Sequence, residues 1–168
     1  MKLCASMEFL DSKLPESAVE ESKASFYQAK NAGLLNENTQ FRYAVDLLKT
    51  NRKANLDLAI DLLEGMVLSI SIPPDLFKRT KDDGFRRDCL FYLAIAYTKL
   101  SEYERALECC DNILKVQPQN HQTMELKQEI LRRIKRDGAT GIAVISGAVL
   151  GAAALIGIGL GIGLSRKK

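Results

Sequence analysis

Few side chains in this chain of 168 residues could act as nucleophiles or metal ligands. There is one histidine, His121, and there are four cysteines: Cys4, Cys89, Cys109 and Cys110. No Cys-x-x-Cys pair occurs and no nucleophile–base pattern is visible, so the spacing of a zinc site or of a thiol enzyme is absent. Cys110 is expected to pack in a core as a small hydrophobe, and Cys109 to be partly exposed. The sequence therefore predicts no metal, no cofactor and no enzymatic activity.

The charges of the chain are unevenly placed. There are 24 lysines and arginines against 21 acidic residues, and Arg166, Lys167 and Lys168 close the sequence. The 21 remaining basic residues balance the 21 acidic ones, so the net charge of +3 comes from this terminal cluster. A basic surface for nucleic acid is not indicated, and no nucleic acid partner is expected.

Residues 139–164 contain no charged side chain. As a helix they would extend about 39 Å, which exceeds the ~30 Å hydrocarbon core of a bilayer. We interpret residues 138–165 as a transmembrane anchor followed by a basic tail over 166–168, with a buried core helix as the alternative. Acidic residues interrupt the first residues of the chain, so no secretory signal is predicted and the preceding domain is expected to face the cytosol.

Glycines recur four residues apart within the expected anchor. The pairs Gly147/Gly151 and Gly157/Gly161 have the GxxxG spacing that lets two helices approach closely in lipid. Two interpretations stay open at this point. The glycines either pack a homo-oligomer through the anchor or only keep the segment weakly hydrophobic.

Helical periodicity recurs through the preceding residues, and the alternation typical of strands is missing. The predicted fold class is therefore all-α, a six-helix bundle followed by one C-terminal transmembrane helix. The expected helices cover residues 16–32, 39–51, 56–70, 85–100, 103–116 and 120–136, with a connector over 73–84. The domain boundaries follow as an N-terminal arm over 1–16 and a helical domain over 17–137.

Residues 87–120 match the 34-residue tetratricopeptide pattern, with Pro118 as the closing proline. Small Ala94 and Ala106 stand where two helices cross closely, and Leu93 and Tyr97 stand beside them. A weaker copy begins near residue 40. The sequence thus predicts two tetratricopeptide-like helix pairs, with the first and last helices as caps.

Several motifs resemble the mitochondrial fission 1 protein family: Thr39–Ala44, Phe91–Ala94, Glu102–Leu107, Pro118–Asn120 and Lys135–Gly138 before a Gly-rich tail. The resemblance runs from about residue 17 to the end. It implies a tetratricopeptide-like bundle on the cytosolic face of the mitochondrial outer membrane and of peroxisomes. It also implies an adaptor for dynamin-related fission GTPases and their accessory proteins, with an N-terminal arm that can lie over the groove. Arg166, Lys167 and Lys168 resemble the basic caps that target such anchors.

The inner helix of each repeat is expected to line a concave partner groove. By repeat position the groove residues are Phe41, Ala44, Leu48, Arg52, Asp88, Phe91, Ile95, Thr98 and Lys99. Chaperone-binding relatives of this repeat use lysine and asparagine at the positions of Ala44 and Leu48. The groove therefore suits an apolar segment or a helix face rather than a terminal carboxylate. Core packing is the alternative for Leu48 and Ile95, and plain solvation for Arg52 and Lys99.

The leading interpretation is a tail-anchored, non-enzymatic adaptor that concentrates fission machinery on an organelle surface. The alternative is a tail-anchored receptor that recruits chaperones, or another tetratricopeptide scaffold receptor. A protein that shapes membranes through anchor oligomers is compatible with the first.

Overall fold

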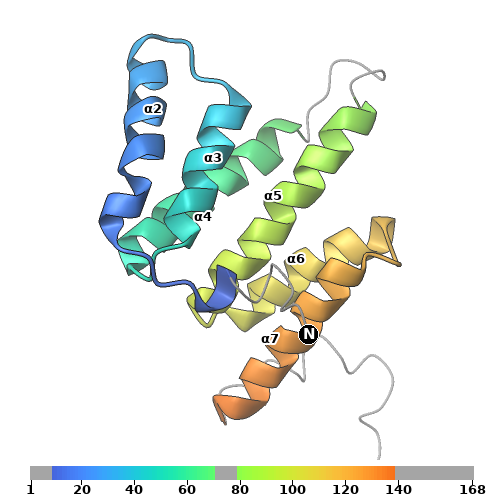
Figure 1. Cartoon of the computed structure of the whole chain (residues 1–168). Coiled ribbons are helices and arrows are strands. Elements are labelled where there is room, and N and C mark those ends of the chain that lie inside the picture. Colours follow the sequence, from blue (N-terminus) through green and yellow to red (C-terminus); the bar gives the residue numbers. More distant parts are fainter. Residues whose placement is uncertain (1–8, 71–78, 139–168) are drawn as a thin grey trace, which may run out of the picture.

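The computed structural model describes residues 9–70 and 79–138, and this part of the chain is helical (Figure 1). Its elements are the short 3-10 helix η1 (Glu16–Val19) and the α-helices α2 (Glu20–Asn31), α3 (Glu37–Leu48), α4 (Lys53–Ile70), α5 (Arg79–Lys99), α6 (Tyr103–Val116) and α7 (His121–Arg136). No strand occurs in the described ranges. The all-α prediction is confirmed for them.

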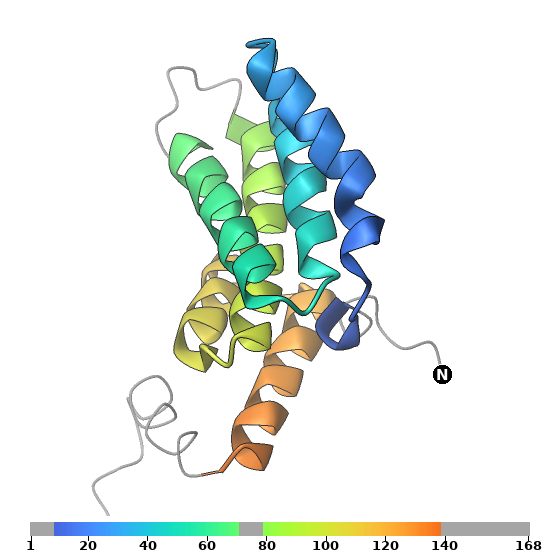
Figure 2. The ribbon, with the colours of Figure 1, turned by 90° about the vertical axis from the view of Figure 1, so that its left-hand side faces the viewer.

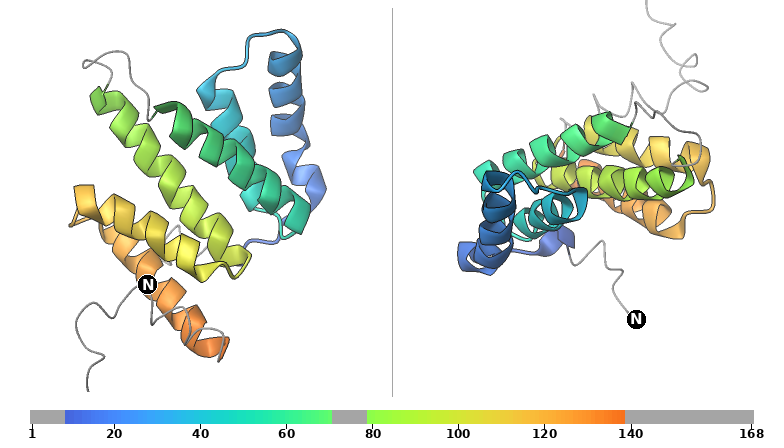
Figure 3. Two further views of the ribbon diagram at one scale, coloured as in Figure 1. Left: turned by 180° about the vertical axis from the view of Figure 1, so that it is seen from behind. Right: turned by 90° about the horizontal axis from the view of Figure 1, so that it is seen from above.

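Each helix from α2 to α7 packs against the next one along the chain. This includes α4 and α5, although the residues between them are not described. Figure 2 shows α2 to α5 side by side, and the view from above in Figure 3 separates two layers. Helices α3, α5 and α7 form one layer, and α4 and α6 lie behind them. The pairs α3/α4 and α5/α6 are the two predicted repeats, and α2 and α7 cover the ends.

The helix boundaries follow local chemistry. Helix α2 ends before Gly33, whose φ of 68° favours a residue without Cβ, and Leu34 N–H donates to the Ala29 carbonyl at 2.9 Å. Helix α3 begins after Asn36, whose side chain accepts from Thr39 N–H. These ends lie within two residues of the predicted ones.

The start of α5 differs from the prediction. The helix begins at Arg79, so residues 79–84, assigned to a connector from sequence, are helical. Polar and charged residues fill this turn, and Pro74 is the last proline before it. The apolar periodicity that indicates a helix starts only at Phe85, because residues 79–84 are polar, charged or glycine.

The core confirms the close crossing in the second pair. Ala94 and Ala106 have no exposed surface, and Leu93 is 3 % exposed. At the outer edge, Arg105 lies over the Tyr97 ring at 4.2 Å and its guanidinium is 2.9 Å from Glu64. This cluster ties α6 to α4 across α5.

Among residues 9–70 and 79–138, no helix has both the length and the apolar character needed to cross a bilayer. The predicted anchor and basic tail lie outside the described residues, apart from Gly138. The same holds for Gly147, Gly151, Gly157, Gly161, Arg166, Lys167 and Lys168.

Candidate functional site: a concave helical face with the arm laid across it

The layer of α3, α5 and α7 presents a face with a pocket of about 220 Å³. Phe41 reaches the pocket from α3, and the N-terminal turn of α7 closes its far side. The lining residues are Phe41, Arg87, Asp88, Phe91, Tyr92, Asn120, Gln122 and Thr123. One face of three helices thus supplies a hollow with aromatic and polar walls.

Aromatic contacts shape the apolar wall of this pocket. The Tyr92 ring lies 5.5 Å from the Phe41 ring and 5.7 Å from the Phe91 ring, both edge to face. Phe41 also lies 5.2 Å from Phe85. Such pairs hold rings in fixed orientations and contribute about 0.5–1.5 kcal/mol each beyond buried area. Tyr92 is only partly buried, so part of its ring is available to a partner.

Residues 9–14 of the chain lie on the same face. The Phe9 ring meets Tyr92 at 5.4 Å, and Leu10 is 4 % exposed. Leu14 N–H and the Ser12 hydroxyl both donate to the Lys49 carbonyl, at 2.9 and 2.8 Å. We call residues 9–14 the docked arm. In this conformation the docked arm occupies the part of the concave face beside the pocket.

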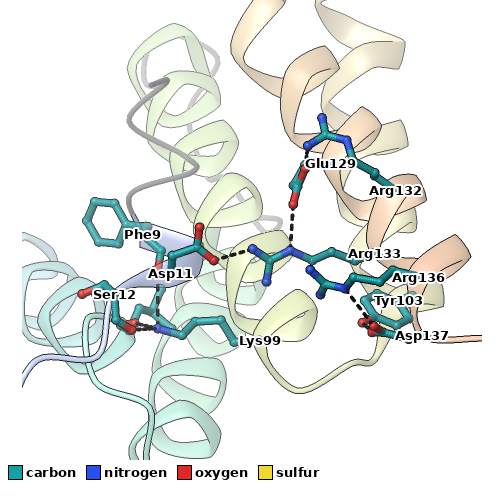
Figure 4. Close-up of polar contacts among 11 residues, drawn as sticks. Phe9, Asp11, Ser12, Lys99, Tyr103, Glu129, Arg132, Arg133, Arg136 and Asp137 are labelled. Atoms are coloured by element: carbon teal, nitrogen blue, oxygen red, sulfur yellow. Dashed lines mark hydrogen bonds and ion pairs between the residues drawn. The ribbon is translucent and has the colours of Figure 1, made fainter. Parts of the chain in front are cut away.

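Lys99 anchors the docked arm to the domain (Figure 4). Its Nζ donates to the carbonyls of Phe9 and Ser12 in the arm, at 3.3 and 2.8 Å, and to those of Leu48 and Thr50, at 2.7 and 2.9 Å. The last carbonyls of α3 have no partner inside the helix, and a cation is favoured at that end. One ammonium therefore satisfies the end of α3 and fastens the arm to it.

Burial of the Lys99 ammonium lowers its pKa to about 8, and the nearby Arg133 and Lys13 add to this effect. Asp11 acts in the opposite direction. Four carbonyl oxygens face an ammonium that has three protons, so the group is well coordinated although partly removed from water.

A second connection links the docked arm to α7 (Figure 4). Arg133 donates to Asp11 of the arm at 2.7 Å and to Glu129 at 3.0 Å. The Glu129 side chain is 7 % exposed and also pairs with Arg132. A buried carboxylate thus orients the arginine that reaches the arm.

The structure brings three of the predicted groove residues together. Phe41, Asp88 and Phe91 line one pocket. Lys99 lies on the same face, under the docked arm rather than in open solvent. Arg52 is exposed at the edge and pairs with Glu16 at the start of η1.

Five predicted groove residues are buried in the described conformation, and of these only Phe91, at 8 % exposed, lines the pocket. Ala44, Leu48 and Ile95 have no exposed surface, and Thr98 is 2 % exposed with its hydroxyl donating to the Ala94 carbonyl at 2.6 Å. Their side chains pack the helices together, because a layer only one helix deep needs apolar residues on more than one side of each helix. Leu48 and Ile95 therefore pack in the core, which was the alternative interpretation of these two residues.

Sequence reasoning missed several residues of this face. Tyr92 stands four residues after Asp88 and seven before Lys99, so helical spacing places it on the same stripe. Lys49 and Arg133 carry no sequence signal, because their role depends on where the arm lies. Thr123 lies three residues after the N-cap residue Asn120. The sequence does not distinguish it from a threonine in the first turn of any other helix.

The three cysteines among the described residues are buried thiols and not activated ones. Cys89 and Cys110 are fully buried, and Cys109 is 8 % exposed, so the expectation of partial exposure for Cys109 was wrong. Burial raises the pKa of each of these three thiols to about 12. Residues 9–70 and 79–138 contain no group of three or more potential metal-ligating side chains.

Comparison with known proteins assigns the chain to a family. The family profile described as Fis1 C-terminal tetratricopeptide repeat matches residues 87–139. The human mitochondrial fission 1 protein is 36 % identical over 143 residues, which cover 85 % of this chain and 86 % of the human protein. The chain belongs to the mitochondrial fission 1 protein family. The family member from Yarrowia lipolytica is 34 % identical over 84 % of this chain and 82 % of its own length.

Solved structures of the family share the fold. Yeast Fis1, crystallised with an Mdv1 fragment, has a TM-score of 0.61 at 21 % identity and covers 77 % of this chain and 92 % of its own. Saccharomyces cerevisiae Fis1 alone gives a TM-score of 0.60 at 21 % identity, over 76 % and 89 %. The tetratricopeptide-like architecture is thereby confirmed. Membership places this chain among mitochondrial fission adaptors rather than enzymes.

Proposed function

We propose that this protein recruits the mitochondrial fission machinery by holding a partner segment on the concave face of α3, α5 and α7. The observation that carries the proposal is the docked arm. A segment of six residues already lies on this face through one aromatic contact, main-chain hydrogen bonds and one ion pair. A partner segment with an aromatic residue and free carbonyls can make the same contacts.

The partner we propose is an accessory protein of the fission machinery, a dynamin-related GTPase, or both. Support comes from the family and from the yeast relative, which was crystallised with an Mdv1 fragment containing an N-terminal extension and coiled-coil domains. A partner bound to an anchored adaptor moves in two dimensions, so its effective concentration at the membrane rises.

The rest of the proposal concerns the membrane. Residues 138–165 would anchor the protein in the mitochondrial outer membrane and in peroxisomes, with the helical domain in the cytosol and 166–168 as the targeting tail. The pairs Gly147/Gly151 and Gly157/Gly161 would support a homo-oligomer in the lipid. Leucine at both Gly147 and Gly151 should then abolish crosslinked dimers of the full chain in membranes.

The experiment is affinity capture from cells with the membrane-extracted full chain. Phe9→Ala with Asp11→Asn removes two side-chain contacts of the docked arm, so capture of fission proteins should rise severalfold. Leu14→Ala is the matched control, because Leu14 is 46 % exposed and uses only its main chain here. Capture of no fission protein by any of these chains would contradict the proposal.

A further inference from the structure

The N-terminus of α7 differs from other helix starts in this chain. Helices α2, α3 and α6 each carry an acidic residue in the first turn, where the helix dipole favours negative charge, but α7 carries none. Helix α4 also lacks one, but its first residues, Lys53 and Ala54, are exposed to solvent. The start of α7 instead forms a wall of the pocket on the concave face.

Two helices of the chain share the same starting motif, which allows a direct comparison. Asn36 and Asn120 are the N-cap residues of α3 and α7, and each is followed three positions later by a threonine whose N–H donates to the cap side chain. In α3 the Thr39 hydroxyl also donates to Asn36, at 3.1 Å. In α7 the Thr123 hydroxyl makes no such bond.

Thr123 is 1 % exposed, and its Oγ1 has no hydrogen-bond partner among the described residues. A buried hydroxyl without a partner costs about 1–3 kcal/mol, so it is seldom left in that state without a reason. Thr123 lines the pocket together with Gln122 of the same first turn. The Thr123 N–H is taken by the Asn120 cap, so in the described part of the chain the unpaired donors at this end of α7 are the Thr123 hydroxyl and the N–H groups of His121 and Gln122.

The charge beside these donors is nearly balanced. Arg87 donates to Asp88 through Nε and Nη2, at 2.9 and 2.7 Å, so the one carboxylate among the lining residues is paired with a guanidinium. The Nη1 group of Arg87 takes no part in these two bonds. The pocket thus combines the positive end of a helix, a free hydroxyl and a guanidinium with a donor to spare.

We propose that this pocket receives an Asp or Glu side chain of the partner segment. The proposal rests on the proposed function and gives it a chemical specificity. The incoming carboxylate would accept from the Thr123 hydroxyl and from the first-turn N–H groups of α7, while adjacent apolar side chains of the partner pack on Phe41 and Tyr92. It supplies the acidic group that the first turn of α7 lacks.

The first test uses the full chain in detergent micelles and two small probes, N-acetyl-glutamate amide and N-acetyl-glutamine amide. The glutamate probe should saturably shift the amide NMR signals of His121 and Gln122, whereas the neutral glutamine probe should not. Thr123→Val should weaken binding of the glutamate probe about tenfold, because one charge-assisted bond is lost. Equal shifts from both probes, or no saturable shift, would overturn the proposal.

Thr39→Val is the matched control, since it removes the equivalent hydroxyl at the start of α3 and should leave probe binding unchanged. Thr123→Ser keeps the hydroxyl and should retain the affinity for the glutamate probe. Unchanged affinity of Thr123→Val would overturn the proposal.

The second test repeats the affinity capture with these variants. Thr123→Val should reduce the captured fission proteins severalfold, and Thr39→Val should not. If the unaltered chain captures fission proteins and Thr123→Val captures them equally, the carboxylate proposal alone fails. If the unaltered chain captures none but binds the glutamate probe, the proposed function alone fails.

Discussion

At the scale of single residues, Lys99 connects three parts of the molecule that are distant in sequence. Its ammonium reaches the arm and the last carbonyls of α3 from the last residue of α5. Sequence position gave Lys99 the same status as Arg52, a charged residue of the inner helix. The structure separates them, because Arg52 lies exposed and Lys99 lies against four main-chain oxygens.

Lys99→Met should destabilise the full chain in detergent micelles by about 2 kcal/mol, because four carbonyls lose a charged donor. Lys53→Met is the control, since Lys53 is exposed and its ion pair among the described residues is with Asp57, one turn away. It should change the free energy of unfolding by less than about 0.5 kcal/mol. Urea denaturation followed by circular dichroism measures both, and equal stability of the two variants would contradict the role of Lys99.

The buried thiols make a prediction that depends on pH. Cys89, Cys109 and Cys110 have pKa values of about 12 in the fold against an ordinary value of 9. At pH 8 they should resist iodoacetamide in the folded chain and react in urea, as read by peptide mass mapping. Because the unfolded chain loses these protons first, stability should fall as the pH rises from 9 towards 12. Rapid alkylation of any of the three in the folded chain would show that it is accessible.

At the scale of elements, the α5/α6 crossing rests on small residues. Ala106 is fully buried at the crossing, as its place in the repeat predicted. Helix propensity would favour a larger residue such as leucine equally well, so the requirement for alanine is one of space and not of helix formation.

Ala106→Leu should therefore destabilise the domain by about 1–3 kcal/mol through overpacking. Ala54→Leu makes the same chemical change in the exposed first turn of α4 and should stay within about 0.5 kcal/mol of the unaltered chain. Thermal unfolding of the full chain in micelles compares them. Similar melting temperatures would mean that the crossing has room for leucine.

At the scale of the whole molecule, one helix joins the proposed partner face to the expected anchor. Helix α7 connects the two, because it contributes Thr123 to the pocket, Arg133 to the docked arm, and ends two residues before the first residue of the expected anchor. The proposed function needs both the partner face and correct targeting.

Replacing Arg166, Lys167 and Lys168 by serine should move the full chain from mitochondria towards the endoplasmic reticulum, because the weakly hydrophobic anchor then lacks its basic cap. Fluorescence microscopy of the tagged chain with organelle markers measures this. Replacing Lys13, Lys23 and Lys30 by serine removes the same charge from the helical domain and its arm and serves as the control. Unchanged mitochondrial targeting would remove the proposed role of the tail.

The sequence by itself determined the order of helices, their approximate ends and the alanines of the second repeat. These follow from local rules, namely apolar periodicity, proline and glycine punctuation, and the repeat spacing of Leu93, Ala94 and Tyr97. It also placed Phe41, Asp88 and Phe91 on one face. The start of α5 escaped because its first turn is polar and carries no periodic signal.

Only the tertiary structure decided which inner-helix residues face a partner and which fill the core. Ala44, Leu48 and Ile95 share a helical stripe with groove positions, yet neighbouring helices cover them completely. The contacts of the docked arm and of Lys99 join residues far apart in sequence, up to 122 positions for Asp11 and Arg133. The burial of the Thr123 hydroxyl without a partner likewise depends on which segments lie around it. Periodicity describes one helix at a time, whereas burial and hydrogen bonding depend on which other segments lie beside it.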